Sequence, residues 1–387
     1  MIPVRYNLRS LMVRRTTSLM TALGVALVVM TMFILLGLVA GLRATMARAG
    51  ARGNWVVLSR GVTTEPWSYV TREQYEIIRE RAEAARDSAG MPLVSPEMVT
   101  AFNPTPDGRL EESSFTYLRG VYPIAYMVHS GIKIDSGRLP VKGRPELIVG
   151  RLLAARFSWL APGHTIHFGR REWTIVGIFS DRGSARESEV WSDLDLLAQD
   201  VHFGSAFSSL HVALRPGMYD PFAAVLTRDS RLNLDAISEP DFYGRQSRLA
   251  DQMRNLGMLI AAILGIGAAF GGMNTMYAAV ARRTREIGVL RALGFSRGDI
   301  LASFAIESLA LALAGGVAGE MLGVIVAIAT GLRSRIMNVE LFIFSFRFAP
   351  PAFLAGLVAA ATIGVLGGLL PAWRAARIGV SDSLRTG

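Results

Sequence analysis

The chain has 387 residues and a formal net charge of +10 at pH 7, with 51% hydrophobic and 19% charged residues. This composition is too apolar for an ordinary soluble protein and favours membrane spans combined with a water-exposed domain. The sequence contains no cysteine, which excludes disulfides, thiolate nucleophiles and cysteine-bound metals.

Residues 1–17 mix four arginines with apolar residues, which predicts an amphipathic helix on the cytoplasmic face of the membrane. A frayed basic tail is the alternative. Residues 18–42 follow without a charge and predict the first transmembrane helix, since about 20 apolar residues cross a bilayer core. That stretch exceeds the roughly 7–15 residues of a signal-peptide core, so we interpret it as an uncleaved anchor.

Three further transmembrane helices are predicted at residues 251–281, 300–332 and 350–373. The segment at residues 300–332 carries two acidic residues, Glu307 and Glu320. Because a charge inside the bilayer is costly, Glu320 is expected to be neutral, paired or turned into the helix bundle. Glu307 lies nearer the cytoplasmic end, where packing or snorkelling accounts for it.

The same segment contains three glycines at a spacing of four residues, Gly315, Gly319 and Gly323. Small residues at this spacing lie on one face of a helix and allow a second helix to approach closely. We expect this face to pack against the fourth span or against a second copy of the chain.

The N-terminal flank, the loop at residues 282–299 and the tail at residues 374–387 together hold twelve arginines, whereas the loop at residues 333–349 holds three. Positive residues favour the cytoplasmic side of an inner membrane, so both termini are expected there. This topology accounts for much of the positive charge and leaves no need for a nucleic-acid partner.

Residues 43–250, between the first two spans, are long enough for a large extracytoplasmic domain. A helix is predicted at residues 71–89, capped by Thr71, and a short helix at residues 151–157. Strands are predicted at residues 55–58, 115–118, 147–149, 165–168, 173–179 and 209–214. The predicted fold is therefore an α-helical bundle of four transmembrane helices plus a large α+β domain between helices 1 and 2.

This domain shows no motif of a hydrolase, a metalloprotease or a dinucleotide-binding enzyme. His164 and His167 are interpreted as a solvated strand edge rather than a metal pair. The acidic residues between Asp181 and Asp195 alternate with arginines and predict a solvated loop. No catalytic residue, cofactor or metal site is therefore predicted on this chain.

The loop at residues 282–299 predicts a short amphipathic helix. Ile287, Leu290 and Leu293 are expected on one side, and Arg282 and Glu286 form an i,i+4 pair. Gly294 is expected to end the helix as a C-terminal cap. Such a helix, parallel to the membrane between two spans, suits contact with a cytoplasmic partner. A connector that shields its own apolar face is the alternative.

The run from Arg282 to Gly294, with Arg283-Thr284-Arg285-Glu286-Ile287-Gly288 at its start, resembles the loop of MacB/FtsX-type ABC permeases. The tail Pro371-Ala372-Trp373-Arg374-Ala375-Ala376 resembles the ending of the same family, although residues 379–382 lack the proline often found there. The layout of one span, a large domain and three spans also matches. Since the sequence has no P-loop, its layout is expected to be closer to permeases of the LolC/LolE type, which carry no fused ATPase, than to MacB itself.

The resemblance implies that the loop is a coupling helix that docks on a separate ABC ATPase. The residues that match the family motif are Arg282, Arg283, Glu286, Ile287, Leu290, Arg291 and Gly294. It also implies a dimer of ATPases that binds ATP and Mg²⁺, a second permease that is a copy or a paralogue, a periplasmic adaptor or carrier, and membrane lipids. The complex would sit in the bacterial inner membrane and drive export of a lipoprotein, a lipid, a peptide or a small molecule by transmitting force.

Two other functions remain open from the sequence. An FtsX-like regulator would use ATP to activate a periplasmic hydrolase, but its external domain is typically smaller than residues 43–250. A membrane sensor or adhesion scaffold would have no use for a coupling helix.

Overall fold

The computed structural model describes residues 15–51, 53–103, 115–246, 248–330, 336–339 and 342–378. Residues 1–14 of the amphipathic helix predicted at residues 1–17 lie outside the described residues, as does the tail from residue 379. The chain divides into two compact units. One is a helical unit made of residues 1–40, 250–333 and 346–387, and the other is an inserted domain made of residues 41–249 with residues 334–345.

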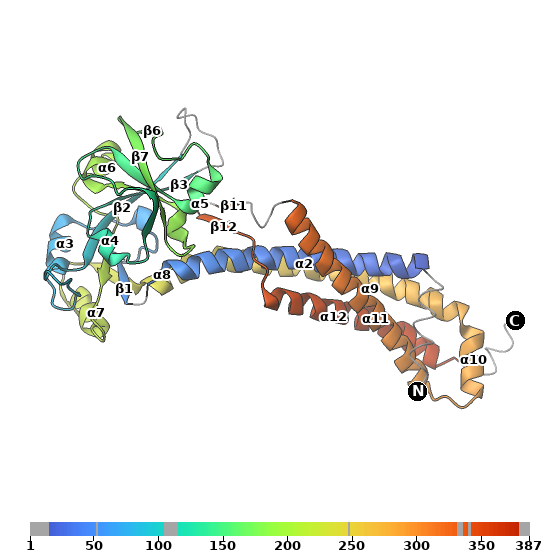
Figure 1. Ribbon diagram of the computed structural model, residues 1–387. Helices are drawn as coiled ribbons and strands as arrows, with labels where there is room; N and C mark the ends of the chain where they lie inside the picture. The colour runs from blue at the N-terminus through green and yellow to red at the C-terminus, as the bar shows by residue number, and fades with distance from the viewer. Residues whose placement is uncertain are drawn as a thin grey trace. The chain divides into compact units, whose positions relative to one another are not determined.

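The helical unit is built from four long helices, α2 (Arg15–Ala49), α9 (Arg248–Arg282), α11 (Arg297–Ala329) and α12 (Pro350–Ala376) (Figure 1). Each is long and apolar enough to cross a membrane, which confirms the four predicted spans. Local signals set their ends: Ser296 and Asp299 form a capping box at the start of α11, and Pro350 begins α12.

The glycines at positions 315, 319 and 323 pack against the first span, and not against the fourth span or a second copy as expected. A Cβ added at Gly315 would lie 2.7 Å from the carbonyl oxygen of Ala22, and one at Gly319 would lie 2.9 Å from the Cα of Ala26. At Gly323 the added atom would meet the ring of Phe33 at 2.7 Å. Atoms of α2 therefore occupy the space that side chains would need, backbone atoms at Gly315 and Gly319 and the ring of Phe33 at Gly323.

The fourth span packs on an adjacent face of α11 through a second set of small residues. A Cβ added at Gly316 would lie 2.6 Å from the Cβ of Ala360, and one at Gly364 would lie 2.6 Å from the Cβ of Ala312. Helix α11 thus holds α2 and α12 at close range on two neighbouring faces. The sequence spacing identified one of these faces but could not name its partner, because glycine carries no side chain that distinguishes one neighbour from another.

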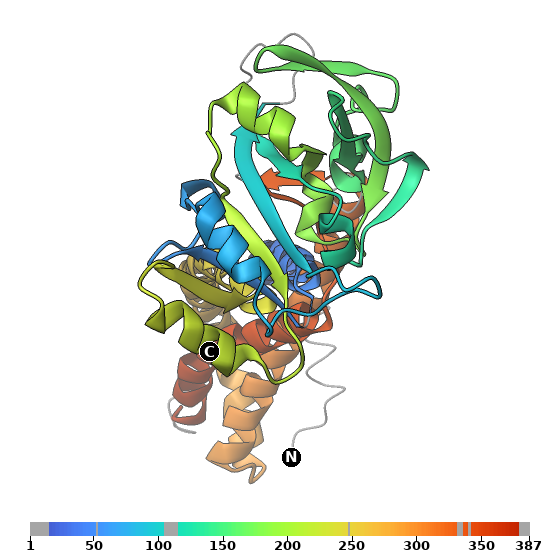
Figure 2. The same cartoon turned by 90° about the vertical axis from the view of Figure 1, so that its left-hand side faces the viewer.

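The inserted domain is a mixed sheet with short helices, as the sequence predicted (Figure 2). The strand order is β10-β1-β9-β2-β3-β8-β5-β7-β4, with β6 paired to β7. Pairs β3–β8 and β5–β7 are parallel and the other pairs are antiparallel. The strands are β1 (Asn54–Ser59), β2 (Val94–Phe102), β3 (Thr116–Val121), β4 (Lys133–Gly137), β5 (Glu146–Gly150), β6 (Thr165–Phe168), β7 (Arg171–Ser180), β8 (Val190–Asp193), β9 (Ser209–Ala213) and β10 (Leu234–Ser238).

Short helices complete this domain, and α3 (blue) and α7 (yellow-green) lie in front of the sheet in Figure 2. The helices are α3 (Arg72–Arg79), α4 (Ala125–Val128), α5 (Arg151–Arg156), α6 (Leu194–Val201), α7 (Tyr219–Arg228) and α8 (Glu239–Gln246), with 3-10 turns η1 (Glu65–Trp67) and η2 (Ala185–Ser188). A second, two-stranded sheet pairs β11 (Ile336–Val339) with β12 (Phe342–Ser345).

Two sequence expectations about this domain were wrong. The helix that begins at the Thr71 capping box ends at Arg79 rather than at residue 89, because the chain beyond it turns so that Ala84 pairs with Leu214, directly after β9. The acidic stretch after β7 is not a solvated loop. The side chains of Asp181, Glu187 and Glu189 are buried beneath the sheet's polar face.

The central strands have one apolar and one polar face, and both faces are buried. Met98, Leu118 and Leu210 point into the main hydrophobic core. Their neighbours in sequence, Glu97, Arg119 and His211, point the opposite way and are also almost fully buried. The turns η1 and η2 and the helices α4 and α8 supply the residues that contact this polar face.

Candidate functional site

The loop predicted to contact a partner forms the helix α10 (Thr284–Ala292), which connects α9 to α11. Figure 1 shows α10 turned across the direction of the four long helices. Gly294 ends it at a φ of +95°, and the N–H of Phe295 donates to the carbonyl of Leu290 at 3.2 Å. The expected glycine cap is therefore confirmed, since only glycine takes this left-handed conformation at little cost.

One face of α10 packs onto the helical unit itself. Ile287 is 2% exposed and joins a hydrophobic cluster that includes Val280 of α9, Phe304 of α11 and Ala372 of α12. The Cα of Gly288 is buried beside it. This face packs α10 against the ends of three long helices.

Arg283 adds an ionic link at the start of α10. Its guanidinium lies 3.2 Å from the carboxylate of Glu307 on α11 and 3.5 Å from that of Glu286. Both Arg283 and Glu307 are buried. Glu307, which sequence reasoning explained by packing or snorkelling, thus has a specific charged partner in the turn between α9 and α10.

The opposite face of α10 is open and carries both charge and apolar surface. Leu293 is 73% exposed and Val289 is 46% exposed, one helical turn apart. Arg282 at the end of α9, and Arg285 and Glu286 on α10, are also exposed. We call these five residues the outer face of α10. A pair of exposed aliphatic side chains accompanied by exposed charges is typical of a small protein contact.

The residues taken from the family motif divide between the two faces. Arg282, Glu286 and Gly294 are exposed, Leu290 and Arg291 are half-buried, and Arg283 and Ile287 point inward. Leu293 lies on the open face, although its spacing from Ile287 and Leu290 had suggested the buried one. Val289 was missed, and its i,i+4 spacing to Leu293 was the available signal.

Glu320 points into the helix bundle, one of the arrangements expected for it. The side chain is 8% exposed, and a Cβ added at Gly356 of α12 would lie 2.6 Å from its Oε1 and 3.1 Å from Val29 of α2. Among the described residues its Oε1 has no hydrogen-bond partner. Gly356 therefore leaves the space that this carboxyl group occupies.

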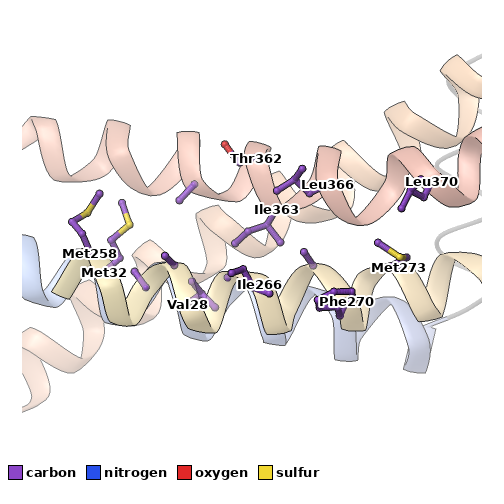
Figure 3. Close-up of a pocket in the computed structure, with 15 residues that line it drawn as sticks. Val28, Met32, Met258, Ile266, Phe270, Met273, Thr362, Ile363, Leu366 and Leu370 are labelled. Carbon is purple, nitrogen blue, oxygen red and sulfur yellow. The ribbon is translucent and has the colours of Figure 1, made fainter. Parts of the chain in front are cut away.

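An apolar groove of about 530 Å³ runs between α2, α9 and α12. Figure 3 shows Ile266, Ile363 and Leu366 along it, with Met32 and Met258 at one end. The hydroxyl of Thr362 is the polar side-chain group in its lining. A surface of this kind suits lipid chains or another apolar helix.

A second site lies in the inserted domain, centred on Arg119 of β3. Its guanidinium contacts the carboxylates of Glu65, Glu97 and Glu189 at 2.7–2.9 Å. Arg186 pairs in the same way with Asp181 and Glu239. Each of these side chains is at least nine-tenths buried. We call these seven residues, together with His129 and His211, the buried ionic cluster.

The two histidines of the cluster were missed by sequence reasoning, which considered His164 and His167 only. Those two are exposed, as expected, with His167 on β6 and His164 directly before it. Burial lowers the pKa of His211, but Glu97, Glu239 and Glu65 outweigh burial and raise it to about 10. Burial lowers the pKa of His129 below its usual value. The alternation of polar and apolar residues in β2, β3 and β9 indicated that the sheet has a polar face. A sheet whose polar face is exposed to water shows the same pattern, so the burial of this face was not predicted.

Comparisons with known proteins agree with this architecture. Residues 18–226 match the family described as MacB-like periplasmic core domain, and residues 258–380 match FtsX-like permease C-terminal. The four apolar helices and the inserted mixed-sheet domain define a multi-pass inner-membrane protein of the permease class. The chain belongs to the MacB/FtsX-like permease family.

The chain is 29% identical over 265 residues to the macrolide export ATP-binding/permease protein MacB of Nitrobacter winogradskyi, which covers 64% of this chain and 39% of that protein. It is 28% identical over 236 residues to MacB of Escherichia coli (strain K12), covering 57% of this chain and 35% of that protein. The chain therefore spans less than half of the length of these relatives.

Among solved structures, the periplasmic region of MacB from Actinobacillus actinomycetemcomitans is 13% identical, with a TM-score of 0.39, and covers 51% of this chain and 94% of that one. The extracellular domain of the noncanonic ABC-type transporter YknZ from Gram-positive bacteria is 13% identical, with a TM-score of 0.36, and covers 48% of this chain and 99% of that one.

Proposed function

We propose that this chain is the permease subunit of an ABC transporter and that a separate ATPase drives it through α10. ATP hydrolysis on the partner would move α10, and the long helices would transmit this movement to the inserted domain on the periplasmic side. The cargo would be a lipoprotein, a lipid, a peptide or a small molecule exported across the cell envelope. Both termini and α10 would lie in the cytoplasm, in keeping with the arginine distribution.

The observation that carries this proposal is the two-sided character of α10. Its inner face is fixed to three long helices through Ile287 and through the ion pair of Arg283 with Glu307. Its outer face presents Val289 and Leu293 to solvent. A mere connector gains nothing from an exposed leucine, whereas a coupling element needs one face for the partner and one face for the spans.

An ABC ATPase is proposed as the partner because MacB/FtsX-like permeases work with such ATPases. The names of the relatives combine ATP-binding and permease functions in one protein, but this chain matches only 39% and 35% of their lengths. The export of macrolides belongs to those relatives by name. For this chain the apolar groove favours cargo, or a partner helix, with hydrophobic surface.

Co-purification of the full-length chain with its ATPase tests the proposal. Val289→Asp and Leu293→Asp should each abolish capture of a P-loop ATPase, identified by mass spectrometry and by ATP hydrolysis, because a charge replaces the apolar centre of the contact. Charge reversal at Arg282 and Glu286 should weaken capture. The matched control is Met91→Asp, which places the same charge at an exposed apolar residue of the inserted domain. Normal capture and ATP hydrolysis with Leu293→Asp would refute the docking role of α10.

A further inference from the structure

The two histidines of the buried ionic cluster face each other at the centre of the polar face of the sheet. His211 lies on β9 and His129 directly follows α4, and their ring centroids are 4.8 Å apart. Their side chains are 0% and 1% exposed. Burial of two adjacent imidazoles costs free energy unless each polar nitrogen has a hydrogen-bond partner or another ligand. Their position therefore calls for a structural explanation.

The Nε2 atoms of both imidazoles converge on two carboxylates. The Nε2 of His129 lies 2.7 Å from Oε1 of Glu97. The Nε2 of His211 lies 3.0 Å from Oε1 of Glu65 and 3.6 Å from Oε2 of Glu97. Ligand atoms from Glu97, His129 and His211 all lie within 4.8 Å of one another. In a tetrahedral zinc site with bonds of about 2.1 Å, neighbouring ligand atoms lie about 3.4 Å apart, so the observed separations bracket that spacing.

The other nitrogen of each ring faces a third carboxylate. The Nδ1 of His211 lies 3.3 Å from Oε1 of Glu239, and the Nδ1 of His129 lies 3.6 Å from the same oxygen. Among the described residues, the Nδ1 of His129 has no hydrogen-bond partner. Histidines that bind a metal through one nitrogen commonly direct the other N–H to a carboxylate, which orients the ring. Glu239 lies where such a ring-orienting carboxylate is expected.

The net charge of the cluster favours the binding of a cation. Five buried carboxylates, on Glu65, Glu97, Asp181, Glu189 and Glu239, surround two guanidiniums, on Arg119 and Arg186. With neutral imidazoles the cluster is therefore short of three positive charges. An uncompensated charge in the protein interior is strongly destabilising. A divalent cation between the Nε2 atoms and the carboxylates of Glu65 and Glu97 would supply two of the missing charges.

We propose that His129, His211, Glu97 and Glu65 form a binding site for Zn²⁺ or a similar divalent transition metal. Two imidazoles and two carboxylates make a donor set that such metals accept in tetrahedral geometry. The cation takes the place of the proton that His211 otherwise holds between these carboxylates. Arg119 bridges Glu65 and Glu97, and Glu239 lies beside the Nδ1 atoms of both rings.

The site is structural. Its four ligands close a tetrahedral coordination sphere, which leaves no open position for a substrate. They come from η1, β2, the end of α4 and β9, so the metal joins four segments that are distant in sequence. It would thereby stabilise the packing of η1 and α4 on the polar face of the sheet.

The test uses the full-length chain, purified in detergent without a histidine tag and stripped of metal with EDTA. Zn²⁺ is titrated in competition with a chromophoric chelator, and the bound metal is examined by X-ray absorption. We expect one Zn²⁺ per chain, with scattering from two imidazoles, and a higher midpoint of thermal unfolding than in the metal-free protein. Absence of imidazole scattering in the wild-type protein would overturn the proposal, whatever the variants do.

Variants then assign the ligands. His129→Gln and His211→Gln should lose tight binding, and Glu239→Gln, which alters only the outer partner, should weaken it by about 10–100-fold. His164→Gln and His167→Gln are matched controls, because these histidines are exposed in the same domain, and they should bind as the wild type does. Unchanged Zn²⁺ affinity in folded His129→Gln and His211→Gln would show that the cluster is an ionic network without a metal, and the proposal would fail.

Discussion

The guanidinium of Arg283 lies 3.2 Å from the carboxylate of Glu307, and this ion pair fixes the start of α10 to α11. The two residues are 24 positions apart in the sequence. Their side chains are 11% and 4% exposed, so solvent screens the pair little. The pair therefore joins a charged residue of the third span to the residue that precedes α10.

Glu307→Gln should loosen this connection. The variant leaves the buried charge of Arg283 without its partner on α11, which costs about 2 kcal/mol on the scale of charged hydrogen bonds. We expect a lower midpoint of thermal unfolding and weaker coupling of ATP hydrolysis to export in reconstituted vesicles. For the thermal midpoint, Glu286→Gln is the matched control, because Glu286 is 58% exposed and contacts the same arginine. The swap Arg283→Glu with Glu307→Arg should recover part of the loss, and a swap no better than the single variants would argue against the pair.

Gly319→Ile should disrupt the helical unit. An added Cβ would meet the backbone of Ala26, which cannot move aside as a flexible side chain can. The yield of folded chain in size-exclusion chromatography should fall severely. The control is Gly267→Ile on α9, where nothing lies within 4 Å of an added Cβ. An equal yield from both variants would contradict the packing of α11 on α2.

Arg119→Lys should destabilise the inserted domain strongly. One ammonium group cannot reproduce the paired bonds that the guanidinium makes to Glu65 and Glu189 while also reaching Glu97. Breaking a buried ionic arrangement costs about 3–5 kcal/mol. Fluorescence of the buried Trp191, which donates to Glu189, can report unfolding. The exposed Arg215→Lys should be neutral, and similar melting curves for the two variants would count against a role for the cluster in stability.

Stability should also fall in acid through Glu146. Hydrogen bonds from Arg138 lower the pKa of Glu146 to about 2, against an ordinary value of 4.5. Because the folded pKa is the lower one, its contribution is present above pH 4.5 and is lost as the pH falls toward 2. Arg138 is about half exposed, so solvent screening limits this contribution to roughly 1 kcal/mol. The difference in thermal midpoint between wild type and Glu146→Gln should therefore shrink between pH 5 and pH 3, and a constant difference would contradict it.

The sequence by itself determined the four spans, the family and the loop that becomes α10. Apolar stretches of bilayer length have few alternatives, and the motif from Arg282 to Gly294 is long enough to be specific. The caps at Gly294 and Thr71 could also be recognised from the sequence, because such signals act over three or four residues. These are local properties of the chain.

Only the tertiary structure decided what packs against each face of a helix or strand. Period-two alternation placed Glu97, Arg119 and His211 on a polar face, but whether water or other protein covers that face depends on segments far away in the sequence. The same holds for the glycines of α11, whose partner proved to be α2, and for Leu293, which lies outside while Ile287 lies inside. Long-range contacts fix these choices, and no local pattern encodes them.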